Sequence, residues 1–141
     1  MEHTLILIKP DGVKKGLIGE VILQFEKARL RLAAVKMLKL TDVILETWYF
    51  HHKDKPFFPG LRSYMQQTPV VAVVLEGENA VSRVRDICGP TDSSKAPKGT
   101  IRGDHGVNIQ ENVIHASDSP ERAKEEMKLL FTDGEVFDYK I

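Results

Sequence analysis

The stretch Thr4-Leu5-Ile6-Leu7-Ile8 is a short apolar run with β-branched residues, and Lys9-Pro10-Asp11-Gly12 follows it directly. An apolar run of this length, bounded by a segment with Pro and Gly, is typical of a buried strand that ends in a turn. Beyond the turn, apolar residues recur at the i, i+3, i+4 and i+7 spacing of one helix face: Ile18, Val21, Ile22 and Phe25. The N-terminal part of the chain therefore predicts a strand, a turn and an amphipathic helix.

The rest of the chain continues this alternation of strand and helix patterns. The further predicted strands are Leu30–Leu40, whose apolar residues follow both parities, Val70–Leu75 and Val113–Ile114. Four further helices are predicted. The first is capped by Thr41-Asp42 and runs toward Tyr49, and the second and third cover Leu61–Met65 and Asn79–Cys88. The last has Ser119 as N-cap and Pro120 at N1, and its buried face carries Ala123, Met127 and Leu130. Gly89–Gly106 is predicted as a long loop and Val136–Ile141 as an extended tail.

This order of elements predicts one α/β or α+β sheet domain over residues 1–141. A length of 141 residues suits one domain with a hydrophobic core of its own. A βαββαβ sandwich with a largely antiparallel sheet fits the pattern, although the order alone does not select it.

Composition excludes several classes of protein. Hydrophobic residues make up 42% and charged residues 28% of the chain, as in ordinary globular proteins. Twenty basic and twenty acidic residues give a formal net charge of zero, and the predicted strands are aliphatic, so we do not expect a nucleic-acid-binding module. Cys88 is the only cysteine, which excludes an intrachain disulfide and a metal site built on several thiolates.

The N-terminus has no signal-peptide layout, and no apolar run has the length of a membrane span. We therefore expect a cytoplasmic protein without a membrane partner.

The segment Asn112-Val113-Ile114-His115-Ala116-Ser117-Asp118-Ser119 places a histidine between a predicted strand and a helix start. His115 is the only one of five histidines with apolar strand residues before it and a capping cluster after it. An imidazole there could act as a nucleophile in phosphoryl transfer, with backbone N–H groups nearby for an anion. Such a nucleophile needs an acceptor on its other nitrogen, and Glu126 is a candidate. From the residues alone, an exposed Glu126 paired with Arg122 at i−4 is the favoured interpretation.

Phosphate-binding side chains occur at several places along the chain. Guanidinium groups bind phosphate oxygens bidentately, and a Thr hydroxyl adds a donor. The candidates are Lys9 at the end of the first strand, Arg85, Thr91 and Arg102. Each basic residue taken alone is more often a solvated surface charge. The chain has no Gly-x-x-x-x-Gly-Lys-Ser/Thr, so a P-loop or protein-kinase nucleotide site is not expected.

Four ordered motifs carry a resemblance to a known family. They are Ile8-Lys9-Pro10-Asp11-Gly12-Val13, Lys55-Pro56-Phe57-Phe58, Gly99-Thr100-Ile101-Arg102-Gly103-Asp104 and the Asn112–Ser119 segment. With these motifs at their spacing, the chain resembles the nucleoside diphosphate kinases nearly end to end.

The resemblance implies a ferredoxin-like βαββαβ sandwich with a four-stranded antiparallel sheet. It also implies a ping-pong reaction that maintains nucleotide pools, in which a nucleoside triphosphate, typically ATP, gives its γ-phosphoryl group to Nδ1 of His115, and the phosphohistidine passes it to a nucleoside diphosphate. Glu126, Ser117 and Tyr49 would support His115. The implied nucleotide-binding residues are Lys9 and Asn112 at the sugar and phosphates, Arg85, Thr91 and Arg102 at the phosphates, and Phe57 stacked on the base. Mg²⁺ would come bound to the nucleotide phosphates, and no protein metal ligand is assigned.

The departures from the family pattern concern Ala116, His105, Asp92-Ser93 and Pro97-Lys98-Gly99, together with a short tail. The resemblance implies that the long loop contributes to subunit contacts, so the departures within it bear on the type of oligomer. It also implies a homo-oligomer, for which we expect first a hexamer and second a tetramer. A catalytically silent scaffold of the same family is an alternative, which the presence of His115, Lys9, Arg102 and Asn112 disfavours.

The spacing of Asn112 and His115 raises a geometric question. Residues three apart on a straight strand face opposite sides of a sheet. We therefore expect the chain to bend or bulge near Asn112 if both side chains serve one nucleotide.

Overall fold

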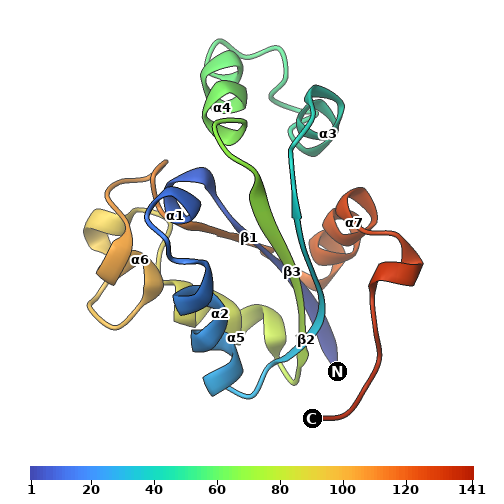
Figure 1. Cartoon of the computed structure of the whole chain (residues 1–141). Helices are drawn as coiled ribbons and strands as arrows, with labels where there is room; N and C mark the ends of the chain where they lie inside the picture. The colour runs from blue at the N-terminus through green and yellow to red at the C-terminus, as the bar shows by residue number, and fades with distance from the viewer.

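The computed structural model describes residues 1–141 and contains a four-stranded sheet with helices against both faces (Figure 1). The strands are β1 (Glu2–Ile8), β2 (Arg31–Leu38), β3 (Val70–Gly77) and β4 (Ile114–Ala116). The α-helices are α1 (Pro10–Lys14), α2 (Ile18–Lys27), α3 (Asp42–Trp48), α4 (Phe58–Met65), α5 (Ala80–Cys88), α6 (Ile101–His105) and α7 (Pro120–Leu130), with short 3₁₀ helices η1 (Ser93–Lys95) and η2 (Asp133–Glu135). No helix combines the length and apolar character that crossing a membrane requires.

The sheet has the strand order β2-β3-β1-β4, and every neighbouring pair is antiparallel. With α2 between β1 and β2 and α5 between β3 and β4, the core is β1-α2-β2-β3-α5-β4. This arrangement confirms the ferredoxin-like βαββαβ sandwich that the resemblance implied.

Two hydrophobic clusters, one on each face of the sheet, account for the continuous apolar character of β1 and β3. Leu5 and Leu7 of β1 pack in a cluster with buried residues of α3, α4 and α7. Ile6 and Ile8 pack in a second cluster with residues of α2, α5 and α6. Because successive side chains of a strand point to opposite faces, a strand covered on both sides needs apolar residues at every position.

The mixed parity predicted in Leu30–Leu40 has a structural cause. The register between β2 and β3 shifts between Leu32 and Ala34, which marks a β-bulge or a comparable irregularity. An extra residue on one strand reverses the face to which the following side chains point. Residues before and after the shift therefore follow different parities within one strand.

Two loop or turn predictions were wrong. Lys9–Gly12 is not a simple turn, because Pro10 opens the short helix α1 as its N1 residue. Gly89–Gly106 is not a continuous loop, because it contains η1 and α6. In α6 the Thr100 side chain caps the helix by accepting a hydrogen bond from the Gly103 N–H at 3.0 Å. Both helices are five residues long, too short for an amphipathic period to appear in the sequence.

Other element boundaries were close. α4 begins at Phe58 rather than Leu61, and β4 covers Ile114–Ala116 rather than Val113–Ile114. The predicted caps Thr41 and Ser119 are confirmed, since each side-chain oxygen accepts a backbone N–H of the first helical turn. Val136–Ile141 is an extended tail, as predicted, and the Phe137 N–H bonds the Ala33 carbonyl at 2.8 Å.

Candidate active site

His115 lies in the middle of β4, an edge strand that pairs only with β1, opposite Leu7. Paired residues share a face of the sheet, so the imidazole lies on the face covered by α3 and α7. Its side chain is 29% exposed. The ring therefore packs against the protein on one side and remains accessible to solvent on the other.

Glu126 of α7 holds the buried side of the imidazole. Its Oε2 atom lies 2.8 Å from Nε2 of His115, and its Oε1 accepts the Ser117 hydroxyl at 2.5 Å. The side chain is only 1% exposed. The interpretation of Glu126 as an exposed carboxylate paired with Arg122 was therefore wrong, although Nε of Arg122 does lie 3.7 Å from Oε2.

The charge of Glu126 fixes the direction of the hydrogen bond to His115. Burial raises the pKa of Glu126, but hydrogen bonds from His115, Ser117 and Trp48 outweigh it and hold the pKa below the ordinary value. An ionised carboxylate only accepts, so Nε2 of His115 donates. In a neutral ring the other nitrogen, Nδ1, then carries the lone pair, which is the state a nucleophile requires.

Trp48, at the end of α3, is a site residue that sequence reasoning missed. Its Nε1–H donates to Oε2 of Glu126 at 2.8 Å, and its ring meets the imidazole edge-on, with centroids 5.2 Å apart. Tyr49, the residue predicted beside His115, stacks on Trp48 at 6.1 Å. Burial, with the nearby Glu126 charge, raises the pKa of Tyr49. Trp48 is the only tryptophan of the chain, but no pattern in the sequence around it indicates a contact with Glu126, 78 positions away.

The bend expected near Asn112 is present as a tight turn at Val113. The Ile114 N–H bonds the Asn112 carbonyl at 2.8 Å, and Val113 between them has φ +74°. This is a γ-turn with a positive φ at its centre, a rare and strained conformation for a β-branched residue. The turn changes the direction of the chain between Asn112 and His115. The two side chains therefore do not have to point to opposite faces of the sheet, as they would on one straight strand.

Helix α1 holds this turn in place. The Val113 N–H donates to Oδ2 of Asp11 at 2.9 Å, and the Val113 carbonyl accepts the Lys9 N–H at 2.8 Å. The other Asp11 oxygen accepts the Tyr64 hydroxyl. A Cβ at Gly12 would lie 3.1 Å from the Val113 carbonyl oxygen, so α1 approaches the turn this closely because residue 12 has no side chain. Strained backbone of this kind persists only where its surroundings determine it.

Three predicted nucleotide-binding residues meet beside the turn. The Lys9 ammonium donates to Oδ1 of Asn112 at 2.8 Å and to the Gln110 carbonyl at 2.6 Å. The Asn112 amide donates to the Thr91 carbonyl at 2.9 Å. Burial, with the nearby Arg102 charge, lowers the pKa of Lys9 to about 8. A partly desolvated ammonium of this kind gains from an anion placed beside it.

Two further predicted residues, Arg102 and Arg85, line the outer edge of β4. Arg102 is 6% exposed and donates to the Ile114 and Gly89 carbonyls, each at 2.7 Å. Arg85 donates to the Ala116 carbonyl at 3.2 Å. The two guanidinium groups thus bind the carbonyls on either side of His115 and cover an otherwise unpaired edge. Burial lowers the pKa of Arg102.

Arg102 also keeps donors for a ligand. A guanidinium carries five N–H groups, and only two of those of Arg102 bond the protein; its buried Nε has no partner. A buried donor without a partner is uncommon, and an anion is one group that can satisfy it.

Phe57 stands apart from these groups. It precedes α4, is 54% exposed and has its ring 5.6 Å from that of His52. No hydrogen bond or ring contact joins it to His115, Lys9 or Arg102. Its exposed aromatic face, at the start of the helix whose Tyr64 ring lies 5.5 Å from the Lys9 ammonium, is compatible with stacking on a base.

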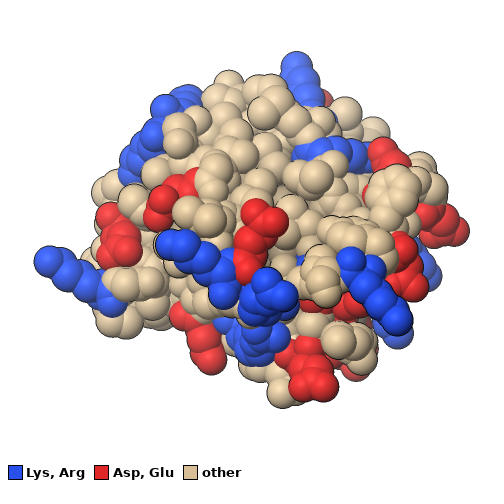
Figure 2. Space-filling model, turned by 60° about the horizontal axis from the view of Figure 1, so that its bottom comes forward, with Lys and Arg blue, Asp and Glu red and all other residues tan.

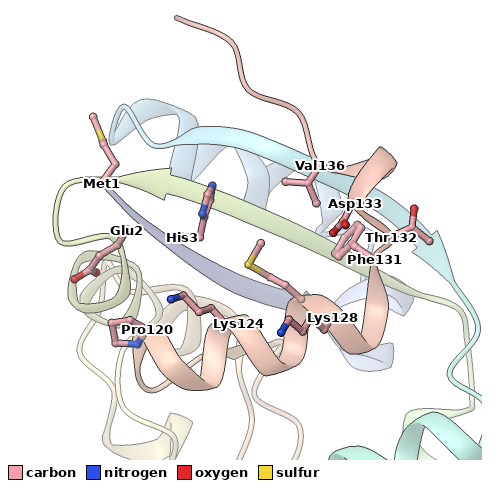
Figure 3. A pocket seen from close by; sticks show the side chains of 11 residues that line it. Met1, Glu2, His3, Pro120, Lys124, Lys128, Phe131, Thr132, Asp133 and Val136 are labelled. Carbon is pink, nitrogen blue, oxygen red and sulfur yellow. The ribbon is translucent and has the colours of Figure 1, made fainter.

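A cavity of about 380 Å³ lies away from these residues, between the start of β1 and α7 (Figure 3). His3, Lys124 and Lys128 are among its lining residues, and none of the predicted site residues lines it. Elsewhere, on the face in Figure 2, basic and acidic side chains are interspersed, as expected from a net charge of zero.

Comparisons with known proteins agree with this geometry. The family model of the nucleoside diphosphate kinases matches residues 2–136. A nucleoside diphosphate kinase of Staphylothermus marinus is 51% identical over 138 residues, which are 98% of each chain. One from Parabacteroides distasonis is 49% identical over 100% of this chain and 92% of its own length.

Solved structures of the same kind of enzyme superpose on the whole chain. A nucleoside diphosphate kinase family protein from Babesia bovis has a TM-score of 0.96 at 40% identity and covers 100% of this chain and 95% of its own. A halophilic nucleoside diphosphate kinase from Halobacterium salinarum, solved in complex with CDP, has a TM-score of 0.94 at 39% identity and covers 99% of this chain and 93% of its own.

Proposed function

The chain belongs to the nucleoside diphosphate kinase family, enzymes that move the γ-phosphoryl group of a nucleoside triphosphate to a nucleoside diphosphate, and we propose that in this chain the group passes through His115. The observation that carries the proposal is the 2.8 Å contact between Nε2 of a partly exposed His115 and a buried carboxylate. We also propose that residues 1–141 form one domain with this activity, since the family model spans residues 2–136.

The reaction has two halves at one atom. The Nδ1 lone pair of His115 attacks the γ-phosphorus of the donor, a P–N bond forms, and the bond to the bridging oxygen breaks so that the diphosphate leaves with its electron pair. In the second half, a terminal oxygen of the acceptor diphosphate attacks the same phosphorus and the P–N bond breaks. Glu126 keeps the proton on Nε2 in both halves and offsets the positive charge that the ring gains on attack.

The remaining residues bind and orient the nucleotide. Lys9, Arg102 and Arg85 supply positive charge on the elements around β4, and we assign them with Thr91 to the phosphates. Asn112, which bonds Lys9, reaches the sugar side, and Phe57 stacks on the base. Ser117 supports Glu126 directly, and Tyr49 does so through its stacking on Trp48. The CDP bound to the Halobacterium salinarum relative supports a nucleotide ligand for this site.

We further propose that Mg²⁺ enters with the nucleotide. The residues assigned to the phosphates include the cationic Lys9, Arg85 and Arg102 and no carboxylate, which suits phosphate oxygens and not a bare cation. No group of three or more His, Cys, Asp and Glu side chains could hold a metal ion. When bound to the phosphates, the ion offsets charge on the leaving diphosphate.

We also propose a cytoplasmic enzyme.

Exposed apolar residues support a homo-oligomer. Val35 and Met37 of the edge strand β2 are 53% and 59% exposed, and Leu23 of α2 is 43% exposed. We propose a hexamer first and a tetramer second. A sedimentation mass equal to that of the 15.9-kDa chain would contradict both.

A labelling experiment tests the function. The protein is incubated with γ-labelled ATP and Mg²⁺, denatured, and examined for covalent label that is acid-labile and base-stable, as expected of a phosphohistidine. We expect label to appear, to require Mg²⁺, and to leave when a nucleoside diphosphate is added. Absence of label in the wild-type protein would favour a silent scaffold and overturn the proposed reaction.

The pKa of Lys9 predicts an alkaline limb in nucleotide binding. Because burial lowers the pKa of Lys9 to about 8, the ammonium loses its charge as the pH rises through that value. If only the charged form binds phosphate, the apparent KM for the diphosphate rises about tenfold between about pH 7 and about pH 9. In Lys9→Met the KM should be high at both pH values and nearly independent of pH. Steady-state kinetics across this range measure both, and a wild-type KM that does not change would contradict the role of Lys9.

A further inference from the structure

The carboxylate of Glu126 receives one more hydrogen bond than its role toward His115 and Ser117 requires. Its Oε2 atom accepts two N–H groups, Nε2 of His115 and Nε1 of Trp48, each at 2.8 Å. Trp48 is 6% exposed, so neither its N–H nor the carboxylate has water as a ready alternative partner. The indole and the imidazole thus share a single oxygen atom.

We propose that Trp48 is a positioning residue for the phosphoryl carrier, which holds Glu126 Oε2 and the His115 ring in the one arrangement that leaves Nδ1 free. The inference rests on the proposed role of His115. Trp48 belongs to the hydrophobic core cluster, and the proposal gives it a role in the reaction in addition to its packing role.

The indole N–H helps to satisfy the buried carboxylate of Glu126. A buried carboxylate needs several donors, because each unsatisfied lone pair retains the cost of desolvation. The charged and titratable groups that face Glu126 are His115 on β4, Arg122 on α7 and Tyr49 after α3. Nε of Arg122, at 3.7 Å, is too far for a hydrogen bond. Without the indole N–H, Oε2 would keep only the bond to His115, and the carboxylate would be freer to rotate or to take up a proton.

The indole ring also restricts the orientation of the imidazole. The planes of the Trp48 and His115 rings meet at 87°, with centroids 5.2 Å apart. The indole thus packs against the imidazole while Glu126 holds Nε2. A 180° ring flip would place Cε1 where Nε2 now meets Glu126, and Nδ1 where Cδ2 now lies, so it would have to break the Glu126 bond and move past the indole. Trp48 therefore opposes the flipped ring, in which Glu126 no longer holds Nε2 and Nδ1 has left its present position.

Loss of the indole N–H should therefore affect turnover and not nucleotide binding. Trp48 makes no hydrogen bond or ring contact with Lys9, Asn112 or Arg102. Loss of an outer hydrogen-bond partner of this kind lowers activity about 10- to 100-fold. The pKa of Glu126, now held below its ordinary value, should rise when a donor is lost, so activity should fall at a higher pH on acidification.

The single tryptophan allows a nearly isosteric test. Growth of the expression host on benzothienylalanine replaces only residue 48, and sulfur then stands in place of the indole N–H. We expect kcat to fall about tenfold or more, KM to change less than about twofold, and the acid limb of the kcat profile to move to higher pH. Trp48→Phe, which removes the donor by mutation, should show the same pattern if the substituted protein does not fold.

A packing control separates positioning from stability. Leu45→Ala opens a cavity in the same core cluster and on the same helix as Trp48 but keeps the indole. It should lower Tm and leave kcat and the pH profile unchanged. Unchanged kcat and acid limb in both donor-free proteins would overturn the proposal, as would an equal loss of kcat in Leu45→Ala.

Labelling of the wild-type protein with γ-labelled ATP is measured in parallel. A wild-type protein that labels, together with donor-free proteins that behave like it, overturns the role of Trp48 alone. A wild-type protein that does not label overturns the proposed function and this inference together.

Discussion

The His115→Ala variant is expected to lose phosphoryl transfer almost completely, with kcat lower by roughly 10⁵-fold or more, the scale seen when a covalent nucleophile is removed. The reason is that no other side chain can replace Nδ1. Ser117 is fully buried and bonds Glu126 and the backbone of Leu5, and the Tyr49 hydroxyl has a raised pKa. Coupled assays of triphosphate formation and the covalent-label assay measure the same loss.

His51→Ala is the matched control for this variant. His51 is exposed, and its one ring contact is with Phe50, so its removal should leave rate and label unchanged. A His115→Ala protein that still takes up acid-labile label would mean that another histidine carries the group. Preserved nucleotide binding in His115→Ala would show that the loss lies in the chemical step.

Local patterns predicted most of the frame of this site. The strand Thr4–Ile8, the capped helix after Ser119 and the buried run Val70–Leu75 are all present, because periodicity and capping depend on neighbouring residues. The same patterns missed α1 and α6, since five residues do not show a helical period. The bulge in β2 was visible only as a conflict of parity.

The environment of Glu126 could not be read from its own neighbours. Arg122 at i−4 suggested a surface ion pair, and that pair is partly formed at 3.7 Å. The carboxylate is nevertheless buried, because α7 packs on the face of the sheet where Trp48 and His115 lie, and both side chains come from distant parts of the chain. From the residues alone Glu126 was a candidate partner of His115 but not the favoured one, and the resemblance implied the pairing; nothing in the sequence indicated Trp48.

The turn at Val113 was expected from the sequence as a bend, but its type and exact position could not be predicted. The three-residue spacing of Asn112 and His115 called for a bend. The bend is a γ-turn at a valine, a residue type that disfavours it. The Asp11 carboxylate and the Lys9 backbone N–H of the first motif hold it by hydrogen bonds to the N–H and the carbonyl of Val113. Two of the four motifs therefore form one structural unit.

The second large effect is expected for Arg102→Met, which should lower both stability and activity. The variant removes two hydrogen bonds from a charged donor, one to the buried Ile114 carbonyl and one to the partly buried Gly89 carbonyl. Each such bond contributes about 1.5–3 kcal/mol, so we expect a loss of about 3–6 kcal/mol in the free energy of unfolding and a Tm lower by roughly 10–20 °C. Thermal unfolding followed by circular dichroism measures this change.

The activity of Arg102→Met should fall further than its stability alone explains. The three N–H donors that Arg102 does not spend on the protein are those we assign to the phosphates, and loss of a positioned donor to developing charge lowers kcat about 10²- to 10³-fold. Arg102→Lys keeps the charge but lacks the planar fork, so it cannot bond both carbonyls and a phosphate at once. It should recover part of the activity and little of the stability. If Arg102→Met instead turned over at the wild-type rate at a temperature where it is folded, Arg102 would serve only to hold the edge of β4, and the phosphate would have to rely on Lys9 and Arg85.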